Sequence, residues 1–182
     1  FVQALAPYVA PMQNMVVADR EGHIGMLSAG RVPLRKAAND LKGQVPAPGW
    51  DARYDWDGFL DAALTPREVD PQRGWIATAN QRIHAPDYPH YITNEWAVPY
   101  RQQRIEQLLA AKPRHSMGSL RDIQSDVLSL ATLRLLPHLQ RAKSTHALAP
   151  AAMQQLAAFD GAMRAEAAAP LIFWAWARQL TL

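Results

Sequence analysis

Residues 12–30, MQNMVVADREGHIGMLSAG, predict a β-hairpin. Met15–Ala18 form an apolar first strand, Asp19–Gly22 carry turn residues, and His23–Leu27 form the return strand. Gly22 suits the positive φ that such a turn usually needs. The hairpin therefore predicts that the first half of the chain contains a β-sheet.

The second half carries helical signals. Pro99 suits a first helical position, and the polar and apolar residues after it continue to a stop before Pro113. Ser119 and Asp122 have the spacing of a capping box, which would start the next helix. Apolar positions of that helix recur every three or four residues, at Leu120, Ile123, Val127, Leu130 and Arg134.

Prolines mark the later helices. Pro137 should end or kink the helix before it, and further helices are expected from Pro150 and from Pro170. The last one, LIFWAWARQL, is apolar on almost every side, which predicts deep burial. The fold class is therefore α+β without βαβ alternation. We expect one partial domain over 1–182, which is rich in strands and loops over 1–80, irregular over 81–98 and helical over 99–182.

The composition excludes several classes of protein. Of the 182 residues, 49% are hydrophobic and 19% are charged, as in a globular chain. The net charge of +3 comes without basic runs, so no nucleic-acid partner is expected. No apolar run is long enough for a membrane span, and the absence of cysteine excludes thiol catalysis and zinc–thiolate sites.

Asn80 ends the apolar part of the stretch GWIATANQR, residues 74–82. Trp75–Ala77 predict a short strand, and Asn80 follows where the apolar run stops. An asparagine in this place can satisfy local backbone groups as a turn or cap residue. It can also aim its side-chain N–H at developing negative charge, as an oxyanion-hole donor does. Residue type alone leaves both interpretations open.

Arg101 shares a helix face with Ile105 and Leu108. We expect its guanidinium to point toward the core or toward a buried site, where it needs an anionic or carbonyl partner.

Asp126 is expected on a helix surface and Asp160 at a helix end. No serine has the glycine pattern of a nucleophile elbow. One loop gathers four potential metal ligands at spacings that match no standard zinc pattern: His84, Asp87, His90 and Glu95.

Several motifs in order give a resemblance to a known family. They are PMQNMVVADREGHIGMLSAGRVPLR, YDWDG, DPQRGWIATAN, YRQQRIEQLL, AFDGAM and APLIFWAW. Together they resemble the penicillin acylase (penicillin amidase) family of N-terminal nucleophile hydrolases. The resemblance implies a fragment of the αββα fold and hydrolysis of N-acylated substrates of the penicillin, cephalosporin or acyl-homoserine lactone type. The nucleophile would be a serine that autocatalytic cleavage exposes, with its own α-amino group as base.

The resemblance also implies roles for three residues. Asn80 would complete the oxyanion hole, Arg101 would organise the active site, and Gln13 would replace an apolar side chain in the acyl pocket. Residue 1 is Phe, and the family's serine lies well upstream of Asn14. The chain is thus expected to be an internal piece of the larger subunit and inactive alone.

The remainder of the same precursor, namely the small subunit and the rest of the large one, would be the chain's partner. Without it, the chain could self-associate through apolar surfaces.

His90 takes the place of an acidic calcium ligand, although Asp87 could substitute, so calcium is in doubt. The family implies a periplasmic or secreted full-length protein. A different interpretation is a non-catalytic helical interaction module with Trp174 and Trp176 as exposed anchors.

Overall fold

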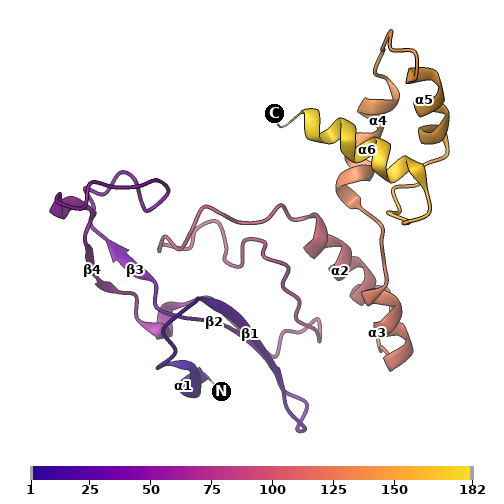
Figure 1. The fold of residues 1–182 in the computed structure, drawn as a ribbon. Helices are drawn as coiled ribbons and strands as arrows, with labels where there is room; N and C mark the ends of the chain where they lie inside the picture. Colours follow the sequence, from indigo (N-terminus) through magenta and orange to yellow (C-terminus); the bar gives the residue numbers. More distant parts are fainter. Residues whose placement is uncertain (1, 181–182) are drawn as a thin grey trace. The chain divides into compact units, whose positions relative to one another are not determined.

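The chain divides after Ala97 into two compact units (Figure 1). The computed structural model describes residues 2–180. In this part of the chain the first unit contains the strands and the second contains helices α2 to α6. The predicted α+β class is confirmed.

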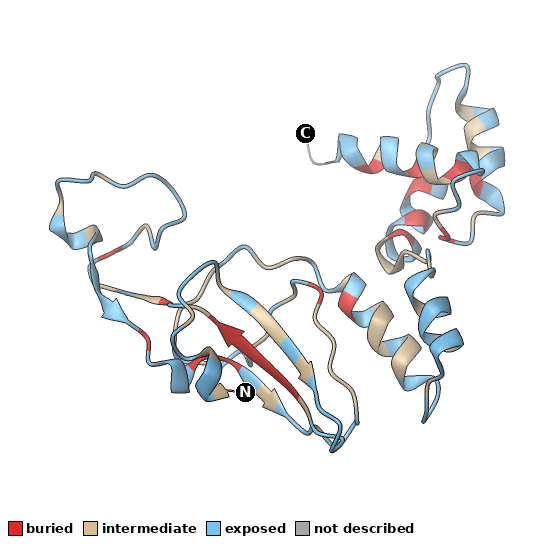
Figure 2. Cartoon of the chain, turned by 60° about the horizontal axis from the view of Figure 1, so that its bottom comes forward, coloured by how far each residue is buried: buried red, intermediate tan, exposed pale blue. Residues whose placement is uncertain are grey.

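A three-stranded antiparallel sheet lies at the centre of the first unit. β1 (Gln13–Ala18) pairs with β2 (Ile24–Ala29), and β5 (Arg67–Val69) pairs with the other side of β2. β2 is the central strand, and Figure 2 shows it buried over nearly its whole length. The predicted hairpin is confirmed, and its register places Asn14 directly opposite Ser28.

Local polar contacts close the hairpin turn. The Asp19 carboxylate accepts a hydrogen bond from the backbone N–H of His23 at 2.9 Å, and Gly22 has a φ of 95°. Asp70, at the end of β5, accepts the backbone N–H of Ile24 at 2.9 Å with one oxygen. Its other oxygen lies 2.8 Å from Nδ1 of His23. These contacts tie the turn of the hairpin to the end of the third strand.

The His23–Asp70 pair makes the hairpin sensitive to pH. The hydrogen bond and charge of Asp70 raise the pKa of His23 above its ordinary 6.5. The Ile24 N–H, followed by His23, lowers the pKa of Asp70 below 3.8. The raised pKa of His23 contributes stability that is fully present below pH 6.5 and is lost as pH rises through the folded-state pKa. The lowered pKa of Asp70 contributes stability that is fully present above pH 3.8 and is lost as pH falls through the folded-state pKa. The pair should therefore stabilise the hairpin most between those two values.

We expect an NMR titration of the His23 imidazole to give a midpoint above 6.5. In the Asp70→Asn variant the midpoint should return toward 6.5, because the introduced amide carries no charge. The oxygen of that amide can still accept the Ile24 N–H, so the hairpin itself should persist. An unchanged midpoint in Asp70→Asn would contradict this description of the turn.

The rest of the first unit is built from short elements. Two further strands, β3 (Pro33–Arg35) and β4 (Trp56–Phe59), form a separate antiparallel pair. The remaining elements are α1 (Val2–Leu5) and single 3₁₀ turns at Ala52–Tyr54 and Ala62–Leu64.

The segment between β5 and the second unit has no helix or strand. The strand predicted over Trp75–Ala77 is therefore wrong. No strand of the described residues pairs with this segment, and a strand needs a neighbour for its backbone groups. A side-chain bond from β1 to Thr78 holds part of it instead.

The second unit is a set of short helices. They are α2 (Tyr100–Ala110), α3 (Met117–Gln124), α4 (Leu130–Gln140), α5 (Ala149–Ala157) and α6 (Ala168–Gln179). The starts expected near Pro99, Pro150 and Pro170 are confirmed to within about two residues. Pro137 does not end its helix, because α4 continues to Gln140.

Two predictions about α3 and α4 are wrong. The capping box of α3 is formed by Ser116 and Ser119, one turn before the predicted pair. The expected single helix is broken between Gln124 and Leu130. The break is held from a distant part of the chain, because Leu128 forms a β-bridge with Ala162 and the N–H of Ser129 donates to the carbonyl of Gly161 at 3.0 Å.

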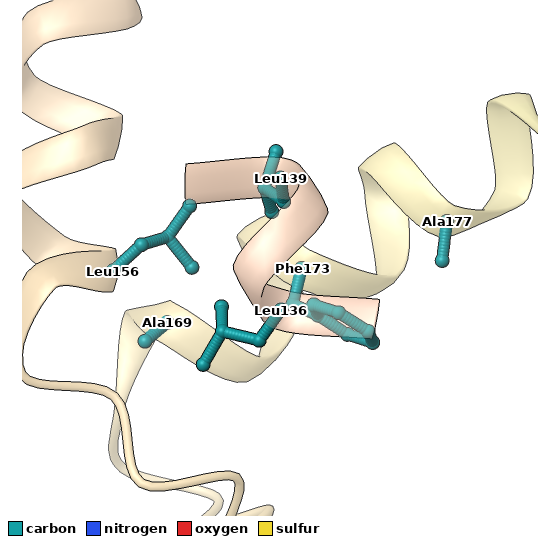
Figure 3. Close-up of a cluster of buried hydrophobic side chains, with 6 residues drawn as sticks. All are labelled: Leu136, Leu139, Leu156, Ala169, Phe173 and Ala177. Atoms are coloured by element: carbon teal, nitrogen blue, oxygen red, sulfur yellow. The ribbon is translucent and has the colours of Figure 1, made fainter. Parts of the chain in front are cut away.

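The core of the second unit lies between α4, α5 and α6 (Figure 3). Phe173 is fully buried at its centre, with Leu136 from α4 and Leu156 from α5 in the same cluster. The rings of Phe159 and Trp176 lie 6.3 and 5.9 Å from that of Phe173, within the usual spacing of aromatic pairs.

Only one face of α6 enters this core. Leu171 is 75% exposed and Trp174 is 51% exposed, so the predicted burial on all sides is wrong. Trp176, the other predicted anchor, is half-buried against the core. None of the helices in residues 2–180 is both long and apolar enough to cross a membrane. Self-association through these exposed apolar side chains stays a prediction.

Candidate functional site

The first unit contains a hollow of about 600 Å³, which is within the usual size range of small-molecule sites. Its lining combines apolar side chains with amide, hydroxyl and charged groups. The lining residues are Met12, Gln13, Asn14, Arg31, Val32, Pro33, Thr78, Asn80, Ile83, Ile92, Thr93, Glu95 and Trp96. The structure thus brings two of the predicted site residues, Gln13 and Asn80, to one cavity although they are 67 positions apart (80 minus 13).

Asn80 occupies a tight corner of the backbone at this hollow. Its backbone φ is 65°, in the left-handed region. Residues other than glycine rarely adopt this region, and asparagine is among those that tolerate it best. Its residue surface is exposed. Its carbonyl accepts the backbone N–H of Ala97 at 2.8 Å. Such backbone conformations persist only where the surroundings fix them, and they are concentrated at functional sites.

The residues just before Asn80 are fixed by side chains. Gln81 Oε1 accepts the N–H of Ala79 at 2.8 Å, and Thr78 Oγ1 accepts Asn14 Nδ2–H at 2.9 Å. The Asn14 side-chain oxygen in turn accepts the hydroxyl of Ser28 at 2.8 Å. This corner, residues 78–80, is therefore held from both the sheet and its own loop. A turn role and a donor role for Asn80 are compatible in this geometry.

Sequence reasoning missed the structural role of Asn14. It used this residue only as a marker of the family resemblance. The sequence pattern that could have indicated this role is a pair of polar residues in an apolar hairpin. Asn14 lies in the first strand, and Ser28 lies opposite it in the second. Paired polar residues on one face of an otherwise apolar hairpin predict a hydrogen-bonded network.

Arg101 lies in the second unit, near the start of α2. The residue is exposed, so the alternative in which its side chain enters the core is wrong, and the alternative of a separate site stays a prediction. It lines a mostly apolar hollow of about 410 Å³ together with Ile105 and Leu108, the two residues with which it was predicted to share a face. The role of Arg101 in an active site stays a prediction.

A second arginine of α2, Arg104, holds a carboxylate. Its Nε and Nη2 donate to the two oxygens of Asp126 at 2.8 and 2.6 Å, and both side chains are more than three-quarters buried. Asp126 lies in the α3–α4 connection, so its predicted place on a helix surface is wrong. The hydrogen bonds from Arg104 lower the pKa of Asp126. Asp160 does follow the end of α5, where it pairs with Arg164.

Replacing Arg104 with methionine should lower the free energy of unfolding of the second unit by about 1–3 kcal/mol at pH 7, because Asp126 loses its partner. A lowered carboxylate pKa contributes stability that is lost as pH falls from 3.8 through the folded-state value. The difference in free energy of unfolding between Arg104→Met and wild type should thus shrink in that pH range. Urea unfolding at neutral and at acidic pH measures this difference. Arg121→Met, at an exposed residue of α3, is the matched control and should change little.

The four potential ligands of the 84–95 loop do not gather around a common point. Among residues 2–180, no three His, Cys, Asp or Glu side chains are placed to hold one metal ion. His84 packs instead on Tyr88 and Trp96, with ring centroids at 4.7 and 5.5 Å. His90 lies 5.5 Å from the ring of Tyr88. These rings give the loop an aromatic cluster, and its member Trp96 lines the hollow.

Comparison with known proteins identifies the family. The penicillin amidase family model matches residues 1–182. The chain belongs to the penicillin amidase family. The acyl-homoserine lactone acylase QuiP of Pseudomonas aeruginosa is 38% identical over an alignment of 192 positions that covers 93% of this chain and 22% of that protein. The penicillin acylase 2 proenzyme of a Pseudomonas species is 36% identical over 169 residues, 92% of this chain and 21% of that protein.

The fold of this penicillin amidase family member also matches a solved structure. The structure of a thermostable penicillin G acylase from Alcaligenes faecalis matches 91% of this chain with a TM-score of 0.67 at 24% identity, and the match covers 30% of the chain in that structure. The chain spans about a fifth of the length of the curated relatives that it matches. Family membership thus assigns the fold of this segment and the general class of its relatives, acylases.

Proposed function

We propose that this chain is a segment of an amide hydrolase that cleaves N-acylated small molecules, and that Asn80 supplies a donor of its oxyanion hole. The observation that carries the proposal is the fixed Asn80 corner beside a hollow of small-molecule size. Membership of the penicillin amidase family supports the reaction class.

The proposed chemistry divides the work between this chain and the rest of the protein. A serine at an amino terminus outside residues 1–182 attacks the amide carbonyl, with its own amine as base. The carbonyl oxygen becomes negatively charged in the tetrahedral intermediate. A side-chain N–H of Asn80 donates to that oxygen, and a fixed donor needs no reorganisation as the charge develops. Collapse of the intermediate releases the amine, and water then releases the acid.

Gln13 is the proposed contact for the acyl group. It lies on the edge strand β1 and lines the same hollow as Asn80. Its amide makes this part of the hollow more polar than an aliphatic side chain would. We propose that Gln13 selects among acyl chains, and that Arg101 helps to organise the active site.

The relatives suggest two substrate classes, because one is named for acyl-homoserine lactones and another for penicillin. Full-length protein should be incubated with an acyl-homoserine lactone and, separately, with penicillin G, and the products should be identified by mass spectrometry. Amide hydrolysis releases the free acyl acid and the intact amine. Ring opening without release of acyl acid, or no turnover of either substrate, would contradict the proposal.

The same preparation of full-length protein tests whether a precursor is cleaved to expose the serine. We propose that the full-length protein cleaves itself and is periplasmic or secreted, as the family resemblance implies. Amino-terminal sequencing of the purified large subunit should give a serine, and cell fractionation should recover the activity outside the cytoplasm. A single uncleaved chain with full activity would contradict the proposed nucleophile.

A further inference from the structure

A chain of polar side chains leads from the centre of the sheet to the Asn80 corner. Ser28 is fully buried in the central strand, and its hydroxyl donates to Asn14 Oδ1 at 2.8 Å. Asn14 then donates from Nδ2 to Thr78 Oγ1 at 2.9 Å. Both side-chain groups of Asn14 are thus engaged, one toward the rigid sheet and one toward the loop.

This chain of bonds acts on a segment that lies outside the sheet. Residues 75–79 belong to no strand, so no β-ladder fixes their path. Thr78 stands two residues before Asn80, and the Asn14 bond joins it to a strand 64 positions away. The Gln81 bond to Ala79 and the Ala97 bond to the Asn80 carbonyl are made within the loop or at its end. The Asn14 bond, in contrast, ties the corner to the sheet.

We propose that Asn14 is a positioning residue that fixes the 78–80 corner on the β-sheet and so holds the Asn80 amide at the hollow. This inference rests on the proposed function of Asn80. Asn14 itself also lines the hollow, but its two amide groups are bonded to Ser28 and Thr78. Small misplacement of a donor is costly, since a shift of about 1 Å can lower a rate about 100-fold.

The test is a double-mutant cycle in the full-length protein. Asn14→Ala should lower kcat for amide hydrolysis about 10- to 100-fold and change KM little. In a protein that already carries Asn80→Gly, the same change should lower kcat by less than about 2-fold, because no donor remains to be positioned. Asn94→Ala is the matched control, at an exposed asparagine outside the lining of the hollow.

A second pair of variants guards against loss of folding. Thr78→Val keeps the shape of the side chain but removes the acceptor, and it should reproduce the fall in kcat. Thr78→Ser keeps the hydroxyl and should restore kcat to within about 3-fold of wild type. If Asn14 had a purely structural role, Asn14→Ala would lower thermal stability equally in both backgrounds. The Thr78→Val and Thr78→Ser variants would then not differ in kcat.

The outcomes separate this inference from the proposed function. If Asn80→Gly lowers kcat and Asn14→Ala lowers it by the same factor in both backgrounds, the positioning role is wrong and the donor role of Asn80 stands. If Asn14→Ala or Thr78→Val leaves kcat unchanged, the positioning role is also wrong. If Asn80→Gly itself leaves kcat unchanged, the proposed function of Asn80 is wrong.

Discussion

Replacing Asn80 with glycine in the full-length protein is expected to lower kcat for amide hydrolysis about 100- to 1,000-fold, the usual effect of removing one oxyanion-hole donor. The change in KM should be small, since the oxygen carries little charge in the bound substrate. Steady-state kinetics on the substrate that the wild-type protein hydrolyses best measures both constants.

Glycine is the right substitution because of the backbone at this position. Asn80 has a φ of 65°, which glycine adopts without strain and alanine does not. Asn80→Ala should therefore lose the same activity as Asn80→Gly and somewhat more stability. An Asn80→Gly variant with wild-type kcat beside an inactive Asn80→Ala variant would mean that the backbone matters and the amide does not. That pair of results would contradict the donor role.

Replacing Phe173 with alanine should have the largest effect on stability. The ring is fully buried between α4, α5 and α6, and its removal leaves a cavity that the neighbouring side chains fill only in part. Such substitutions cost about 3–5 kcal/mol, a large part of the stability of a typical domain. Urea unfolding followed by tryptophan fluorescence should show the loss, since Trp174 and Trp176 lie 5.7 and 5.9 Å from the ring.

Leu171→Ala on the same helix is the control for Phe173→Ala. Leu171 is on the exposed face, so its truncation should change the free energy of unfolding by less than about 0.5 kcal/mol. Equal losses in the two variants would show that the buried face of α6 is assigned wrongly. A smaller loss at Phe173 than at Leu171 would show the same.

The elements that could be predicted are those that local chemistry determines. The hairpin was predictable because Asp19 and Gly22 make the turn between two apolar strands. The helix starts near Pro99 and Pro150 follow from what proline does to the first turn of a helix. Neither depends on contacts with distant residues.

The elements that could not be predicted depend on such contacts. The break between α3 and α4 is bonded to residues 161 and 162, more than about thirty positions away. The expected strand at Trp75 has no partner strand in the part of the chain described. The corner at Asn80 is fixed partly by Asn14, and hydrophobic periodicity carries no information about that bond.

The candidate site was predicted in the same uneven way. Residue type singled out Asn80 but left a turn role and a donor role open, and the family resemblance added Gln13. Their meeting at one hollow is a result of the fold. Arg101 was expected to point toward the core or toward a buried site because its helix face was apolar, and its exposure excludes only the core.

The central claim is that Asn80 binds the charge of the transition state and not the ground-state substrate. A phosphonate analogue of the tetrahedral intermediate tests it most directly, by comparing its inhibition constant in wild-type protein and in Asn80→Gly. We predict that the affinity falls by about the same factor as kcat/KM, roughly 100- to 1,000-fold, while KM is little changed. Equal affinity of the two proteins for the phosphonate would contradict the claim.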